Sequence, residues 1–116
     1  MVCTFLGPRQ CPPHIEKLLD HVLDDLIRQM DVDEFLVSDD GDFDKMVRKK
    51  LMEAESSLDI KSVPPKIIGA ERKLWMVEHS DIVISYLPHT GFGLIRYLRL
   101  AEKLGKQTIH LTSIKV

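Results

Sequence analysis

The residues from His79 to Arg96 contain the strongest candidate for a ligand site. Residues 81–87 are almost all apolar and rich in β-branched side chains, which indicates a strand buried on both faces. A glycine-containing turn follows, and helical spacing resumes at Leu94. This order places unpaired helix N-terminal amides at the carboxyl end of a parallel sheet, where they favour an anion. The sequence therefore predicts anion binding by four residues of the turn, Thr90, Gly91, Phe92 and Gly93.

Two arginines are the predicted partners of that anion, because a guanidinium group suits bidentate contact with phosphate. Arg9 belongs to the turn that starts at Gly7, and Arg72 lies near the start of a later helix. We expect the turn that starts at Gly7 and the turn at residues 88–93 to face one another across a crevice in the sheet. Gly7, Arg9 and Arg72 would then lie at the ligand. The alternative is a tight turn that binds nothing, with both arginines in ordinary surface ion pairs.

Four aspartates gather between Asp39 and Asp44, after a second predicted strand. Their order lacks the alternating ligands and the final glutamate of a calcium-binding EF-hand loop. Acidic side chains at the start of a helix are favoured by its dipole and bond its free amides, which predicts a capping role. Contact with a ligand hydroxyl or with Mg²⁺ is the alternative interpretation.

The sequence assigns no catalytic residue. Its serines lack a GxSxG setting, and neither an HExxH motif nor a paired-cysteine site is present. Cys3 and Cys11 fit no CxxC pattern, so we expect free thiols. We therefore expect no metal and no cofactor.

The length and charge of the chain restrict its class. A chain of 116 residues forms one domain with a single core. A formal net charge of -2 gives no general attraction to nucleic acid. No apolar stretch approaches the roughly 20 residues needed to cross a bilayer. The first ten residues look like a strand rather than a signal peptide, so we expect a cytoplasmic protein with no membrane or direct nucleic-acid partner.

Strand and helix patterns alternate along the chain. This order predicts an α/β fold, a doubly wound parallel sheet of four to five strands, with the first strand beside the one at residues 81–87. Residues 58–63 form either a brief edge strand or a plain connection. The other strands are predicted at residues 2–6, 34–38 and 108–112, and helices at residues 14–30, 43–52, 64–79 and 94–104.

Five short motifs follow one another in a characteristic order: Gly7-Pro8-Arg9, the Gly41/Asp44 pair, residues 71–76, Ser80-Asp81 and Pro88-x-x-Gly91-Phe92-Gly93. Together they resemble the SLOG superfamily of Rossmann-like domains. That superfamily includes the cytokinin-activating phosphoribohydrolases, DNA-processing proteins and small bacterial families of unknown function, to which the similarity is closest. The resemblance spans nearly the whole chain. It implies a single Rossmann-like domain of bacterial type, with Gly41 and Asp44 at the ligand.

The chain departs from that family pattern in three places. The segment before Pro64 is short, so the third strand is expected to be lost or vestigial, which would leave the strand at residues 34–38 as an open edge. A polar residue of the first turn is replaced by Pro8. The threonine and glutamate of the phosphoribohydrolase motif are replaced by Leu94 and Tyr97, while Arg72 matches its arginine. These two replacements argue against N-glycosidic cleavage by that route.

Two functions of different classes remain open. The first is a domain that binds a nucleotide or a nucleotide-derived phosphate, as a sensor or a partner protein. The second is a nucleoside-phosphate hydrolase. Beside these two stands a third option, a degenerate scaffold whose remaining role is dimerisation. A carboxylate that reaches the glycine crevice would favour the enzyme, with three candidates, Asp39, Asp44 and Glu71.

A homodimer is expected for any of these functions. A small domain without one edge element exposes apolar surface, and two-fold pairing commonly covers such surface. The predicted contacts lie on helix faces that carry Trp75 and Met76, or Leu98.

Overall fold

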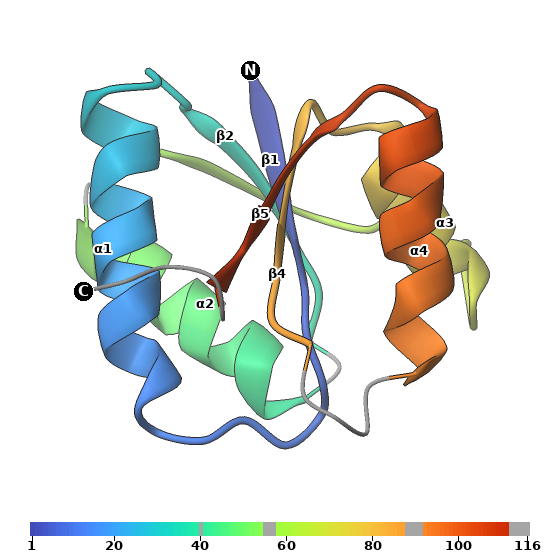
Figure 1. The fold of residues 1–116 in the computed structure, drawn as a ribbon, viewed down its shortest axis with the longest axis horizontal. Helices are drawn as coiled ribbons and strands as arrows, with labels where there is room; N and C mark the ends of the chain where they lie inside the picture. The colour runs from blue at the N-terminus through green and yellow to red at the C-terminus, as the bar shows by residue number, and fades with distance from the viewer. Residues whose placement is uncertain (40, 55–57, 88–91, 112–116) are drawn as a thin grey trace.

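The computed structural model describes residues 1–39, 41–54, 58–87 and 92–111, with Phe92 described in its backbone alone. Its five strands are all parallel and lie in the order β3-β2-β1-β4-β5 (Figure 1). The strands are β1 (Val2–Leu6), β2 (Glu34–Val37), β3 (Asp59–Ser62), β4 (Ile82–Ser85) and β5 (Gln107–His110). The helices are α1 (Ile15–Arg28), α2 (Asp42–Ala54), α3 (Glu71–Glu78) and α4 (Phe92–Lys103).

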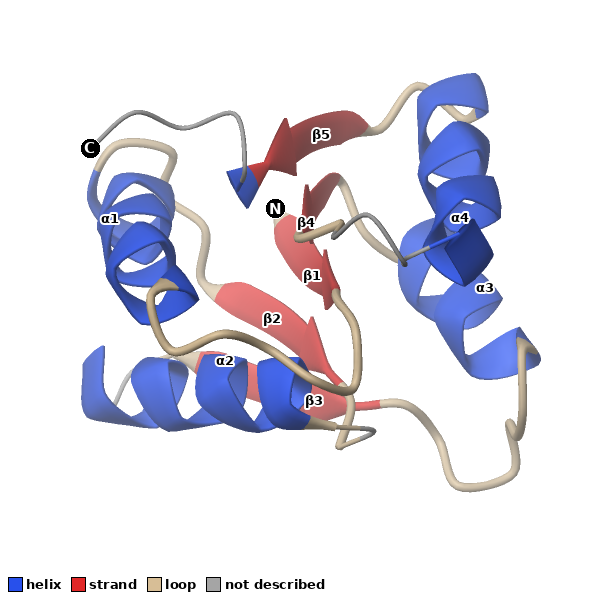
Figure 2. Cartoon of the chain, turned by 60° about the horizontal axis from the view of Figure 1, so that its bottom comes forward, coloured by secondary structure: helices blue, strands red, loops and turns tan. Residues whose placement is uncertain are grey.

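The helices cover both faces of the sheet. Helices α1 and α2 lie on one face, and α3 and α4 lie on the other (Figures 1 and 2). The interior strand β4 is buried on both sides: Ile82 and Ile84 join the core under α1 and α2, while Val83 joins the core under α3 and α4. Such alternation is what a strand with apolar residues at every position produces. The fold is the predicted doubly wound, Rossmann-like α/β fold.

The strand order reverses at β1, which lies between β2 and β4. Thr4 pairs with Leu36 on one side and with Val83 on the other. The adjacency of β1 and β4 is therefore confirmed. Helix α1, which follows β1, lies on one face of the sheet, and helix α4, which follows β4, lies on the other (Figure 1). Connections that diverge in this way open a crevice at the carboxyl ends of the two strands, where open α/β sheets bind ligands.

The third strand is present, so β2 is not an edge of the sheet. Phe35 of β2 pairs with Ile60 of β3. The expectation of an open edge at β2 is wrong. Most side chains of β3 are polar and exposed, and backbone pairing rather than an apolar pattern forms the strand.

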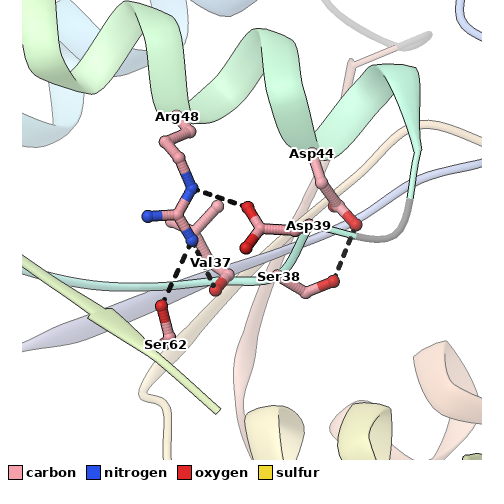
Figure 3. Close-up of polar contacts among 6 residues, drawn as sticks. All are labelled: Val37, Ser38, Asp39, Asp44, Arg48 and Ser62. Carbon is pink, nitrogen blue, oxygen red and sulfur yellow. Dashed lines mark hydrogen bonds and ion pairs between the residues drawn. The ribbon is translucent and has the colours of Figure 1, made fainter.

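An arginine of α2 ties this edge strand to its neighbours (Figure 3). Arg48 Nη2 donates to the carbonyl of Val37 at 3.4 Å and to Ser62 Oγ at 3.3 Å. Its Nε lies 2.9 Å from Oδ1 of Asp39. One side chain thus joins α2 to the carboxyl ends of β2 and β3.

Helix α3 begins at Glu71, and not at the prolines near residue 64 as predicted. Gly69 has a φ of 62°, in the left-handed region, so no right-handed helix can run through it. The Arg72 amide then donates to the Gly69 carbonyl at 3.2 Å as the helix starts. The remaining helices and strands begin and end within a few residues of the predicted positions, with residue 112 outside the described residues.

Two of the residues predicted to contact a dimer partner are buried in the core of the domain. Met76 and Leu98 are 1% and 6% exposed, so neither presents an apolar surface to a partner. Trp75 is half-buried and stacks on His79 with ring centroids 4.2 Å apart. Within the described ranges, no helix is both long enough and apolar enough to cross a membrane.

Candidate functional site

A cavity of about 560 Å³ lies where the predicted crevice was expected. It is bordered by the loop after β1, the start of α2, the start of α3 and the start of α4. Its lining residues are Gly7, Pro8, Arg9, Ser38, Asp44, Gly69, Ala70, Arg72, Lys73, Met76, Gly93, Leu94, Arg96 and Tyr97.

The cavity brings together five of the residues predicted from the sequence: Gly7, Arg9, Asp44, Arg72 and Gly93. Phe92 begins α4, but its side chain is outside the described part of the chain, as are Thr90 and Gly91. Gly41 is not among the lining residues.

Gly41 supports the loop that carries Arg9. A Cβ added to Gly41 would lie 2.5 Å from the Cα of Arg9, so only glycine permits this approach of two backbones. The Asp42 amide donates to the Arg9 carbonyl at 2.7 Å. The structure thus gives Gly41 a role in placing Arg9, and its contact with a ligand stays a prediction.

Asp44 brings a buried carboxylate to the cavity. It lies in the first turn of α2 and is 7% exposed. Its Oδ2 accepts a hydrogen bond of 2.8 Å from the hydroxyl of Ser38, which is itself buried (Figure 3). Asp39 instead pairs with Arg48, and Glu71 is not a lining residue. Of the three candidate carboxylates, Asp44 is therefore the one that reaches the cavity.

The arginines of α3 and α4 are held at the cavity by neighbouring groups. Arg72 Nη1 donates to the Ile67 carbonyl at 3.0 Å. Arg96 Nη2 donates to the Tyr97 hydroxyl at 2.7 Å, and its guanidinium carbon lies 4.8 Å from the centre of that ring. A guanidinium carries five N–H donors, so one such bond fixes its position and leaves others for an anion.

Sequence reasoning missed Ser38, Lys73, Arg96 and Tyr97 as lining residues. A signal was available for two of them. Arg96 and Tyr97 follow Gly93 by three and four positions in a helix, and such residues share one face. Leu94 and Tyr97, where the family pattern has threonine and glutamate, both line the cavity. The replacements therefore fall at the site itself.

The charge of the cavity is strongly positive. Among the lining residues that the structure describes, Arg9, Arg72, Lys73 and Arg96 supply four cationic side chains and Asp44 supplies one carboxylate. Clefts lined by one sign of charge concentrate the oppositely charged ligand. This charge contrasts with the formal net charge of -2 for the whole chain.

The cysteines offer no nucleophile. Both are free thiols, as predicted. Burial, together with the nearby charge of Asp42, raises the pKa of Cys11 to about 11. Burial raises the pKa of Cys3 far above its ordinary range. Across the residues that the structure describes, no group of three or more His, Cys, Asp and Glu side chains is placed to hold a metal ion.

A serine–histidine pair lies outside the lining of the cavity. Ser85 Oγ is 2.5 Å from His110 Nδ1, across the paired strands β4 and β5. Ser85 is 1% exposed, so a substrate has no access to its hydroxyl. The bond satisfies a buried polar group, as the interior of a protein requires.

Comparison of the chain with known protein families, with curated proteins and with solved structures gives no match. The resemblance to the SLOG superfamily therefore stays a prediction from the sequence motifs.

Proposed function

We propose that the chain binds a small phosphorylated ligand, a nucleotide or a nucleotide-derived phosphate, and acts as a sensor or partner protein in the cytoplasm. The observation that carries the proposal is the gathering of four cationic side chains around one cavity at the carboxyl ends of a parallel sheet. Its volume of about 560 Å³ lies within the range of sites for small molecules and cofactors.

We expect the phosphate of the ligand to bind at the start of α4. The amides of Gly93 and Leu94 are among the first four of this helix, which lack intrahelical acceptors. Gly93 is exposed, and a Cβ added there would meet no atom within 4 Å, so an anion has room to approach. Arg72 and Arg96 line the same cavity as Gly93 and Leu94, and Arg9 lines it from the loop after β1.

The rest of the lining favours an organic phosphate over an inorganic one. Pro8, Met76, Leu94 and Tyr97 contribute apolar surface to the same cavity. An inorganic anion gains nothing from such surface, whereas a sugar or a base can be buried against it.

A melting experiment tests the proposal. Nucleoside mono- and diphosphates, inorganic phosphate and pyrophosphate are screened for a rise in Tm of the whole chain. A ligand at 100 times its Kd stabilises the native state by about 2.7 kcal/mol. We expect nucleotides to raise Tm more than inorganic phosphate does. No rise with any nucleotide would contradict the proposal.

The matched variants are Arg72→Ala and Arg28→Ala. Arg28 lies on α1 in an exposed pair with Asp24 and is not a lining residue of the cavity. Loss of a charged hydrogen bond at Arg72 should weaken binding by about 1.5–3 kcal/mol. Arg28→Ala should bind as the unaltered chain does. Equal weakening by both changes would point to a general loss of positive charge.

Hydrolysis of a nucleoside phosphate is the second candidate function, favoured by one observation: the carboxylate of Asp44 reaches the cavity. In that reaction water adds across the bond between the sugar and the base, which releases the free base and a sugar phosphate. Measurement of free base from a nucleoside monophosphate distinguishes the enzyme from the binding protein. Because Leu94 and Tyr97 replace the family's threonine and glutamate, we expect release to be slow or absent.

We also propose that the chain forms a homodimer. Among the described residues, no strand pairs with the outer edge of β5, and an unpaired strand edge is a template for another chain. Sedimentation at micromolar concentration should show twice the mass of 13.3 kDa. A single species at 13.3 kDa would contradict the dimer.

A further inference from the structure

Asp44 is a negative group in a cavity whose other charged side chains, among the described residues, are positive. Its carboxylate is 7% exposed and is held by the Ser38 hydroxyl at 2.8 Å. A carboxylate repels an anion, so it adds nothing to the direct attraction of a phosphate. An ionised carboxylate accepts hydrogen bonds at about four positions and donates none. Its presence therefore points to a ligand that carries hydrogen-bond donors as well as negative charge.

The carboxylate of Asp44 and the arginines of α3 and α4 border different parts of the cavity, with Lys73 on the side of the carboxylate. A smaller inner hollow, too narrow for a water molecule, adjoins it, and five residues line both: Gly7, Ser38, Asp44, Lys73 and Met76. Arg72, Arg96 and Gly93 line the main cavity but not the hollow. The carboxylate is thus on the inner side of the site, and the start of α4 is on the outer side.

The strand order sets the distance between these sides. Ser38 directly follows β2, and α4 follows β4, with β1 between the two strands. Neighbouring strands lie about 4.8 Å apart, so the two sides are separated by roughly 10 Å at the sheet. One nucleoside phosphate, with its sugar next to its phosphate, spans a separation of this order.

We propose that Asp44 is the acceptor for the neighbouring hydroxyls of a ribose whose phosphate lies at the start of α4, and that Ser38 positions this carboxylate. The inference rests on the proposed function and adds to it the class of ligand, a ribonucleotide rather than a deoxyribonucleotide. A pair of N–H donors on a base offers Asp44 the same chemistry, and the experiment separates these sources.

The experiment is isothermal titration calorimetry of the whole chain with AMP, its 2′-deoxy form and its 2′,3′-dideoxy form. These three probes share one phosphate and one base. Each hydrogen bond to a charged acceptor is worth on the order of tenfold or more in Kd. We expect AMP to bind at least tenfold more tightly than the dideoxy form. GMP in the same series tests the base, and a ratio between GMP and AMP larger than the ratio between ribose and dideoxyribose would overturn the assignment to the sugar.

Asp44→Asn and Ser38→Ala separate recognition from support of the fold. Asn fills the same volume but removes the charge. The ratio of the Kd of the dideoxy form to the Kd of AMP should therefore fall toward one. Binding of the dideoxy form should stay equal or tighten, because a repulsive charge is gone. Ser38→Ala should reduce this ratio in part. Loss of all three ligands in parallel would show that Asp44 acts only through the fold, and would overturn the inference.

The measurements on the unaltered chain stand without these variants if either fails to fold. Equal affinity for AMP and the dideoxy form would refute the role of Asp44 while leaving the phosphate site intact. No binding of any of these nucleotides would refute the proposed function, and the inference with it.

Discussion

The ring of Phe43 packs directly against the backbone of Gly7. A Cβ added to Gly7 would lie 2.2 Å from Cδ2 of that ring, which is fully buried. Phe43 belongs to the first turn of α2, and Gly7 begins the loop that leads to Arg9. This contact therefore sets the distance between two of the segments that border the cavity.

Gly7→Ala should destabilise the fold by about 1–3 kcal/mol, the usual cost of overpacking a core. Urea unfolding followed by circular dichroism measures the change. Gly93→Ala is the matched control, because a Cβ at Gly93 meets no atom within 4 Å. The control should keep or slightly raise stability, since alanine favours a helix more than glycine does. Equal stability of the two variants would show that the contact with Phe43 is not tight.

Arg48→Met should loosen the edge strand β3. The change removes the bonds to Val37 and Ser62 and the ion pair with Asp39. We expect the free energy of unfolding to fall by about 0.5–1.5 kcal/mol. Relative to the unaltered chain, amide exchange should become faster in β3, and more so than in β1. Arg28→Met is the control, because its pair with Asp24 is exposed and contributes little. Unchanged exchange in β3 would mean that strand pairing alone holds this edge.

Alkylation of Cys11 should be slow at pH 7.5 and should accelerate as the pH approaches 11. The thiolate is the reactive form, and burial with the charge of Asp42 raises the pKa of this thiol to about 11. At pH 7.5 the rate with iodoacetamide should be on the order of a hundredfold below that of an ordinary cysteine with a pKa of about 8.5. Glutathione is the reference thiol. A rate equal to that of glutathione would contradict the buried setting of Cys11.

Cys11 should make the fold less stable at high pH. A thiol in the unfolded chain loses its proton at a lower pH than Cys11 does in the native state. Above the unfolded pKa, the unfolded state therefore binds fewer protons than the native state, and the free energy of unfolding falls as pH rises from about 9 to 11. Cys11→Ser should flatten part of this decline. A decline that is identical in both proteins would assign it to other groups.

The fold was predictable where the apolar pattern is continuous. The uninterrupted run around Ile84 predicted a strand buried on both faces, and its position beside β1 followed from the handedness of the crossovers. The polar strand β3 was less certain, because Asp59 and Lys61 carry no such pattern and backbone pairing to β2 forms the strand. The start of α3 was misplaced, because a proline pair indicates a first turn, whereas the conformation of Gly69 is known only from the structure.

The site was predictable in its position more than in its composition. Arg9, Arg72 and Asp44 come from three segments that the topology brings together, and each was a candidate in the sequence. Lys73 and Arg96 were not predicted at the site, since which face of a short helix meets a cavity depends on the packing of its neighbours. Gly41 was assigned to the ligand, but a motif does not distinguish a glycine that touches a ligand from one that lets two loops approach.

The most direct test of the ligand site is a titration of the ¹⁵N-labelled chain with AMP, followed by amide chemical shifts. We predict that the amides of Gly93, Leu94 and Gly7 shift first and saturate together, because the phosphate lies at the start of α4 and the sugar reaches toward β1. The groove between α1 and α2, lined by Asp20, Leu23 and Lys50, serves as the internal reference. Shifts confined to that groove, with Gly93 and Leu94 unchanged at saturation, would contradict the account.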